Sequence, residues 1–162
     1  MQKLGKQFIK PYDDLFPQCS VRGKLNLPKR VRHLLVRGEK DMKVIGLDHL
    51  VLTVGDMARS VEFYTRILGM ELVTSGGGRQ ALRFGRQTIN LHKRGREIEP
   101  KAKYPSPGSA DICFIIDSQI SELLPQLQVA HINIVEGPMQ IAGALGLIES
   151  IYIRDPDENL LE

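Results

Sequence analysis

The stretch GLDHLVLTVGDMARSVEFYTRILGM, residues 46–70, contains two different periodicities of apolar residues. Its first part, GLDHLVLTV, alternates around leucine and β-branched residues, which is typical of a strand. Apolar residues then recur at the spacing of one helix face, at Met57, Val61, Tyr64 and Leu68. Asp56 precedes this face as an N-cap, and Gly69 follows it as a C-terminal stop. The stretch therefore predicts a strand followed directly by a helix.

Three more strands are predicted after this helix, and the same order then recurs. The first three strand candidates are MELVTS, RQALRFG and QTINLH. Beyond a linker at residues 93–108, the segments ADICFIID, SQISELLPQLQVA, INIVEG, GLIESIYIRD and ENLLE repeat the order strand, helix and three strands. Two modules, residues 43–95 and 109–162, indicate an internal duplication. We predict an α+β fold in which two βαβββ modules form a curved, partly open barrel-like sheet with helices outside.

Composition and length favour one globular domain over residues 42–162. The chain has 162 residues, of which 42% are hydrophobic and 25% charged. No apolar run approaches the roughly 18 to 20 residues that a membrane span needs, so no membrane partner is expected. The two cysteines, Cys19 and Cys113, lie far apart, which argues against a disulfide framework or a cysteine-based zinc site. A reducing, cytoplasmic location fits this pattern, and Cys113 is predicted to be a core residue of a strand.

The positive charge is concentrated in residues 1–41, which contain ten Lys and Arg residues against four Asp and Glu residues. This segment is either a solvated or disordered extension or a mitochondrial targeting segment. Transit peptides are rich in serine and poor in acids, whereas this segment contains Asp13, Asp14 and a single serine. No aromatic stacking pattern accompanies the charges, so no nucleic-acid partner is expected.

Strand parity separates apolar from polar side chains. In the first strand, His49, Val51 and Thr53 share one face, and the apolar residues Leu50, Leu52 and Val54 share the other. The other predicted strands show the same separation, with Asn90 and His92 opposite Ile89 and Leu91, Asp111 and Cys113 opposite Ile112 and Phe114, and Leu160 and Glu162 together. Polar side chains therefore recur on the face that points away from the helices. Glu162 is either an exposed residue without a role or a side chain that its strand carries into a site.

These residues carry a family resemblance. The duplication, DHLVLTV followed by SVEFYTRILGM, and the closing RDPDENLLE resemble the vicinal oxygen chelate superfamily over residues 43–162. This superfamily includes glyoxalase I, extradiol dioxygenases, methylmalonyl-CoA epimerases, and fosfomycin and bleomycin resistance proteins. Within it, INLH, PGSADICFI, EGP and SIYIRDPD are most similar to the branch of glyoxalase domain-containing protein 5.

The resemblance implies a divalent metal (Zn, Ni, Mn or Fe) on the polar face. In the family, ligands lie at the start of the first strand and on the last strand of each module. His49 and Glu162 match two of these positions, and His92, or Asn90 two residues earlier, lies on the last strand of the first module. We expect His49, His92 and Glu162 to bind the metal. Asp111, where relatives often have histidine, is expected to act with Glu162 in catalysis, as a weak ligand or as a base.

The family also implies a function. We expect a metal-dependent enzyme that acts on a small molecule chelating through two oxygens, by lyase, isomerase or dioxygenase chemistry. The alternative is a binding or sequestering protein of the bleomycin-resistance type. A homodimer is expected, with the modules pairing within or between chains. Glu158 stands where the family turn usually has glycine, so a positive φ there would cost about 1 kcal/mol.

Overall fold

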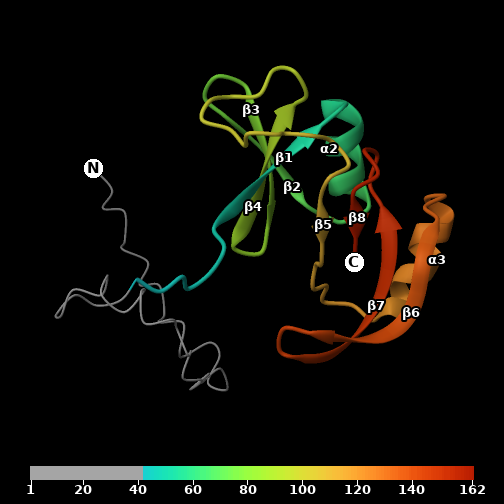
Figure 1. Ribbon diagram of the computed structural model, residues 1–162. Coiled ribbons are helices and arrows are strands. Elements are labelled where there is room, and N and C mark those ends of the chain that lie inside the picture. Colours follow the sequence, from blue (N-terminus) through green and yellow to red (C-terminus); the bar gives the residue numbers. More distant parts are fainter. Residues whose placement is uncertain (1–41) are drawn as a thin grey trace, which may run out of the picture. The chain divides into compact units, whose positions relative to one another are not determined.

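The computed structural model describes residues 42–162. The chain divides into two units, residues 1–46 and residues 47–162, and all helices and strands of the described part lie in the second unit (Figure 1). The predictions for residues 1–41, an extension or a targeting segment, fall outside the described residues. Within residues 42–162 no helix is long and apolar enough to cross a membrane.

The first module forms a four-stranded sheet with one helix. Strand β1 (His49–Val54) precedes helix α2 (Met57–Arg66), and β2 (Glu71–Ser75), β3 (Arg79–Phe84) and β4 (Gln87–Lys93) follow. The strand order is β1-β4-β3-β2. β1 pairs with β4 in parallel, and the other pairs are antiparallel.

The second module repeats this arrangement. Strand β5 (Asp111–Ile112) precedes helix α3 (Ile120–Val129), and β6 (Ile134–Gly143), β7 (Gly146–Arg154) and β8 (Leu160–Leu161) follow. The strand order is β5-β8-β7-β6, with β5 parallel to β8. The repeated order confirms the predicted α+β fold of two βαβββ modules. The two sheets remain separate four-stranded sheets and do not close into a barrel.

One predicted strand is much shorter than expected. The segment ADICFIID was predicted to be a strand throughout, but β5 contains only two residues. A strand needs a hydrogen-bonded neighbour, and within this segment only Asp111 and Ile112 pair with β8. Beyond them, the Phe114 amide still donates to the Glu162 carbonyl at 2.8 Å, and Ile115 is 80% exposed.

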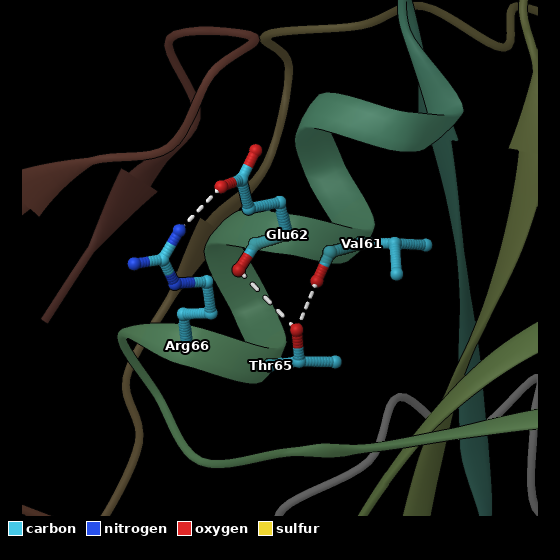
Figure 2. Close-up of polar contacts among 4 residues, drawn as sticks. All are labelled: Val61, Glu62, Thr65 and Arg66. Carbon is cyan, nitrogen blue, oxygen red and sulfur yellow. Dashed lines mark hydrogen bonds and ion pairs between the residues drawn. The ribbon is translucent and has the colours of Figure 1, made fainter.

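Helix α2 begins and ends where the sequence predicted. The Asp56 carboxylate accepts a hydrogen bond from the Arg59 amide at 3.0 Å, and this bond is the main reason why the pKa of Asp56 is lowered. Gly69 follows the helix with a φ of 64°. Figure 2 shows polar contacts in the last turns of α2, where Arg66 forms an ion pair with Glu62 at 2.7 Å and the Thr65 hydroxyl donates to the Val61 carbonyl at 2.7 Å.

The apolar residues of both modules form one hydrophobic cluster. The strands supply Leu52, Val54, Leu82, Ile89, Leu91, Ile151, Ile153 and Leu161, and the helices supply Phe63, Tyr64, Ile120 and Leu127. The predicted parity of β1 and β4 is confirmed, because Leu52, Val54, Ile89 and Leu91 are buried, whereas Val51 on the opposite face is 49% exposed. The opposite side of each sheet is called its helix-free face below. In the first module this face carries His49, Asn90 and His92, and in the second Asp111, Cys113, Ser150 and Glu162.

Candidate functional site

A buried carboxylate organises the turn that precedes β8. Asp155 is 3% exposed and accepts four hydrogen bonds. The donors are the Tyr64 hydroxyl at 2.9 Å, the Asp157 and Asn159 amides at 2.9 Å each, and the Asn159 side-chain amide at 2.8 Å. These four bonds use the acceptor capacity of an ionised carboxylate. Burial and the neighbouring Asp155 carboxylate raise the pKa of Tyr64, so its hydroxyl keeps the proton that it donates.

The same turn connects the two modules. The Asp157 carboxylate accepts from the Gly55 amide at 2.9 Å and from the Ser60 hydroxyl at 3.4 Å, at the start of α2. A Cβ atom on Gly55 would lie 2.7 Å from the Asp157 carboxylate oxygen, so this close approach requires glycine. The side-chain oxygen Oδ1 of Asn159 accepts from the Ala110 amide at 2.9 Å, which fixes the entry into β5. The turn therefore sets the position from which Glu162 leaves β8.

Both the backbone and the side chain of Glu162 form hydrogen bonds. Its amide donates to the Ile112 carbonyl at 2.9 Å. The hydroxyl of Ser150, a residue that is 4% exposed, donates to Glu162 Oε1 at 2.8 Å. The second carboxylate oxygen, Oε2, accepts no hydrogen bond from the described residues. Glu162 is therefore a positioned carboxylate with one oxygen still available to a ligand.

Two further side chains lie beside Glu162. Cys113 was predicted to be a core residue of a strand, but it is exposed and follows the end of β5. Tyr152 on β7 is half-buried. Partial burial raises the pKa of both groups first, and the neighbouring Glu162 carboxylate raises it further. Both groups thus remain protonated beside the carboxylate near neutral pH.

The side chain of His49 also has a hydrogen-bond partner. Its Nδ1 lies 2.7 Å from a carboxylate oxygen of Asp48, and the imidazole is 48% exposed. Histidines that bind metals usually donate their other ring N–H to such a partner, which fixes the ring and its tautomer. This arrangement leaves Nε2 of His49 as the nitrogen that can bind a ligand.

The strand register separates His92 from His49. In the pairing of β1 with β4, His49 lies level with Thr88, and His92 lies level with Thr53. Four residues along a strand correspond to about 13 Å. His92 instead lines two cavities on the helix-free face of the first module, of about 330 and 210 Å³. Asn90 lines the larger of these.

The register also gives Glu162 a counterpart in the first module. Asn90 lies level with Val51 on β1. Since Asp111 lies level with Leu160, the next residue on the same face, Cys113, corresponds to Glu162. Val51 lies two residues after His49, and Cys113 lies two residues after Asp111. Asn90, level with Val51, is therefore the counterpart of Glu162, which is level with Cys113. The role of His92 as a ligand stays a prediction.

The predicted metal ligands form no metal-binding group of three among the described residues. In residues 42–162, no group of three or more His, Cys, Asp or Glu side chains could hold a metal ion. Glu162 lines a cavity in the second module, of about 360 Å³, that contains neither histidine. Asp111 is exposed at the start of β5. The chemistry of the donors nevertheless fits a divalent metal, since imidazole and carboxylate are ligands for Zn, Ni, Mn and Fe.

Sequence reasoning missed three residues that support this site, namely Asp48, Ser150 and Asp155. The sequence contained a signal for Asp48, because an aspartate directly precedes the predicted ligand His49. Asp155 occurs in the DPDEN segment, where Asp and Asn residues are typical of a turn. Ser150 had no such signal, since its contact with Glu162 depends on the pairing of β7 with β8.

The comparisons with known proteins agree with this architecture. A family model described as Glyoxalase/Bleomycin resistance protein/Dioxygenase superfamily matches residues 46–162. The chain is 52% identical over 126 residues to the glyoxalase domain-containing protein RDO1 of Mycosarcoma maydis, which covers 78% of this chain and 71% of the relative. The crystal structure of the virulence protein STM3117 from Salmonella typhimurium is similar with a TM-score of 0.72 and 51% identity, over 74% of this chain and 95% of that one. The metallothiol transferase FosB of Staphylococcus epidermidis is 28% identical over 123 residues, covering 75% of this chain and 82% of the relative.

Proposed function

Because the chain belongs to the Glyoxalase/Bleomycin resistance protein/Dioxygenase superfamily, we propose that it is a metal-dependent, glyoxalase-like enzyme. Its substrate would be a small molecule that chelates through two neighbouring oxygens. The reaction would be a lyase, isomerase or dioxygenase step. The name of the Staphylococcus epidermidis relative, a metallothiol transferase, supports a role for metal in this family.

One observation carries this proposal. On each helix-free face, a side chain that can bind a metal forms a hydrogen bond to a neighbouring residue through one of its atoms. Its second nitrogen or oxygen atom could bind a metal. His49 is oriented by Asp48 at 2.7 Å, and Glu162 is oriented by Ser150 at 2.8 Å. Such partners raise the affinity of a metal site by fixing ligand orientation before the metal binds.

The chain's own residues account for the remaining chemistry. A bound divalent metal would stabilise negative charge that develops on the substrate oxygens. Asp111 lies on the same face as Glu162, and its exposed carboxylate can take up a proton from a substrate carbon and return it. Ser150 donates to Glu162 Oε1, so that Oε2 would be the oxygen left to bind a ligand. The protonated Cys113 and Tyr152 next to Glu162 can donate hydrogen bonds to substrate oxygen.

A homodimer would complete the site. Each chain carries His49 on one sheet and Glu162 on the other, and within residues 42–162 these ligands do not form one group. If the helix-free face of the first module meets that of the second module in a partner chain, the two sets of ligands face each other. A two-fold dimer then contains two equal sites.

Metal analysis of the purified protein, together with its mass in solution, tests the proposal. We expect about one divalent metal per chain in a dimer, and strong loss of metal in His49→Ala and Glu162→Ala. His131→Asn is a matched control, because His131 is an exposed histidine with a φ of 57° that asparagine tolerates. Metal that is absent from the wild type after dialysis against each of Zn, Ni, Mn and Fe(II) would refute the enzyme and favour the sequestering protein.

Mixing two inactive variants distinguishes a shared site from a site within one chain. A dimer of one His49→Ala chain and one Glu162→Ala chain has one doubly damaged site and one intact site, if each site takes ligands from both chains. We therefore expect about half of the wild-type metal content in the mixed dimer. If both ligands come from the same chain, each site keeps one defect and mixing restores nothing.

A further inference from the structure

The cavity beside Glu162 differs in character from the rest of the site. It measures about 360 Å³ and is lined mostly by apolar side chains of the second module. The sheet contributes Ile148, Ile151, Ile153 and Leu161, and α3 contributes Ile120 and Leu123. Ser150 and Glu162 also line it, so the carboxylate lies at the boundary of an apolar space. This cavity is called the apolar cavity below.

The apolar cavity lies where the sheet of the second module approaches α3. The segment that follows β5, residues 113–116, lines the cavity together with Ile120 and Leu123 of α3. Ile151 and Leu161, on the helix side of β7 and β8, line it as well. The same cavity therefore contacts both the buried side of the sheet and Glu162.

The lining selects one kind of ligand group. Most of the lining side chains are apolar, and the lining contains no Lys, Arg or His residue. A charged substrate group would lose hydration there without a partner of opposite charge. The cavity of about 330 Å³ on the helix-free face of the first module differs from it, because charged and polar side chains, Arg79, Asn90, His92 and Glu99, are part of its lining. The two ends of a substrate would thus meet different surroundings.

We propose that the apolar cavity binds the apolar substituent of the substrate, whose oxygen-bearing end lies at Glu162. The proposal rests on the proposed function for the position of the oxygen-bearing end. A cavity of about 150 Å³ can hold benzene, so the apolar cavity has room for roughly twice that volume, about ten carbon atoms. The substrate class is an amphipathic molecule, with two neighbouring oxygens at one end and a medium-length alkyl or aromatic group at the other.

A homologous series of n-alkyl hydroxamic acids, from two to fourteen carbons, tests this inference by titration calorimetry on the metal-free full chain. The hydroxamic acid end is neutral at pH 7 and carries two neighbouring oxygens. Each methylene that enters the apolar cavity should tighten binding about fourfold. The increase should stop near ten carbons, where the apolar cavity is full.

Two isoleucines provide a matched pair of variants. Ile148 on β7 lines the apolar cavity, whereas Ile141, directly opposite it on β6, does not. Both are half-buried, so phenylalanine is a comparable perturbation at each position. Ile148→Phe should end the increase several carbons earlier, and Ile141→Phe should leave the series unchanged. Ile116→Trp, at a 40% exposed position of the lining, provides a second blocked variant with less risk to folding.

The outcomes separate this inference from the proposed function. If affinity does not depend on the length of the alkyl chain, the inference is wrong. It is also wrong if Ile148→Phe and Ile141→Phe change the chain-length dependence equally. Both conclusions hold whether or not metal changes the affinity. If chain-length dependence is present, adding Zn or Mn should tighten every member of the series by the same factor. Chain-length dependence without any effect of metal keeps the apolar cavity as a binding site and removes the metal-dependent enzyme.

Discussion

Replacing Tyr64 by phenylalanine tests whether the buried Asp155 carboxylate organises the fold. The tyrosine ring is fully buried, and its hydroxyl donates one of the four hydrogen bonds that Asp155 accepts. Phenylalanine keeps the packing of the ring and removes only this donor. A hydrogen bond to a charged group contributes about 1.5 to 3 kcal/mol, so we expect the free energy of unfolding to fall by about 2 kcal/mol.

Urea unfolding measures this loss. With an m-value of about 2 kcal/mol/M, the midpoint should fall by about 1 M and the slope should stay constant. Tyr104→Phe is the matched control, because Tyr104 is 81% exposed and accepts the same substitution without losing a buried bond. Its free energy of unfolding should change by less than about 0.5 kcal/mol.

A double-mutant cycle shows whether the loss of stability in Tyr64→Phe comes from the hydrogen bond between Tyr64 and Asp155. Asp155→Ala alone should cost about 3 to 5 kcal/mol, because it leaves several buried donors without an acceptor. In that background Tyr64→Phe should cost at least about 1 kcal/mol less than in the wild type. A Tyr64→Phe midpoint within about 0.25 M of the wild type, or the same cost in both backgrounds, would refute this account of the turn.

Three further predictions concern pH, strain and thiol reactivity. The pKa of Tyr64 is raised in the folded state, so the contribution of its hydroxyl to stability is complete below about pH 10 and is lost as the pH rises further. In urea titrations, the difference in stability between wild type and Tyr64→Phe should therefore shrink above about pH 10. Glu158 has a φ of 70°, so Glu158→Gly should stabilise the fold by about 1 kcal/mol in the same assay, and a destabilisation would mean that its pairing with Arg154 outweighs the strain. The pKa of Cys113 is raised by partial burial and by Glu162, so in a Cys19→Ser background iodoacetamide at pH 8 should modify it more slowly than free cysteine. Glu162→Gln should accelerate that modification, and an unchanged rate would contradict the influence of Glu162.

Local patterns in the sequence predicted most of the fold. Alternation in β1 and β4 identified the core residues Leu52, Val54, Ile89 and Leu91, and the cap at Asp56 identified the start of α2. These features depend on residues close together in the chain. The same patterns predicted too long a strand at β5, because strand length there depends on a neighbour that begins almost fifty residues later.

The site was predictable only in part, for the same reason. Parity placed Glu162 and Asp111 on the helix-free face, and the positive φ of Glu158 agrees with the glycine that the family has there. The partner of Glu162, Ser150, lies on a different strand, and no spacing in the sequence brings the two together. The separation of His49 from His92 follows from strand register, which side-chain alternation alone does not specify.

The contact between Asp157 and the start of α2 has a consequence for how a duplicated chain can diverge. The Gly55 amide and the Ser60 hydroxyl in the first half depend on a carboxylate from the second half. A side chain at position 55 would collide with the Asp157 carboxylate, so a substitution of Gly55 would require a compensating substitution of Asp157. The two halves are therefore no longer interchangeable copies, and each constrains which mutations the other can accept.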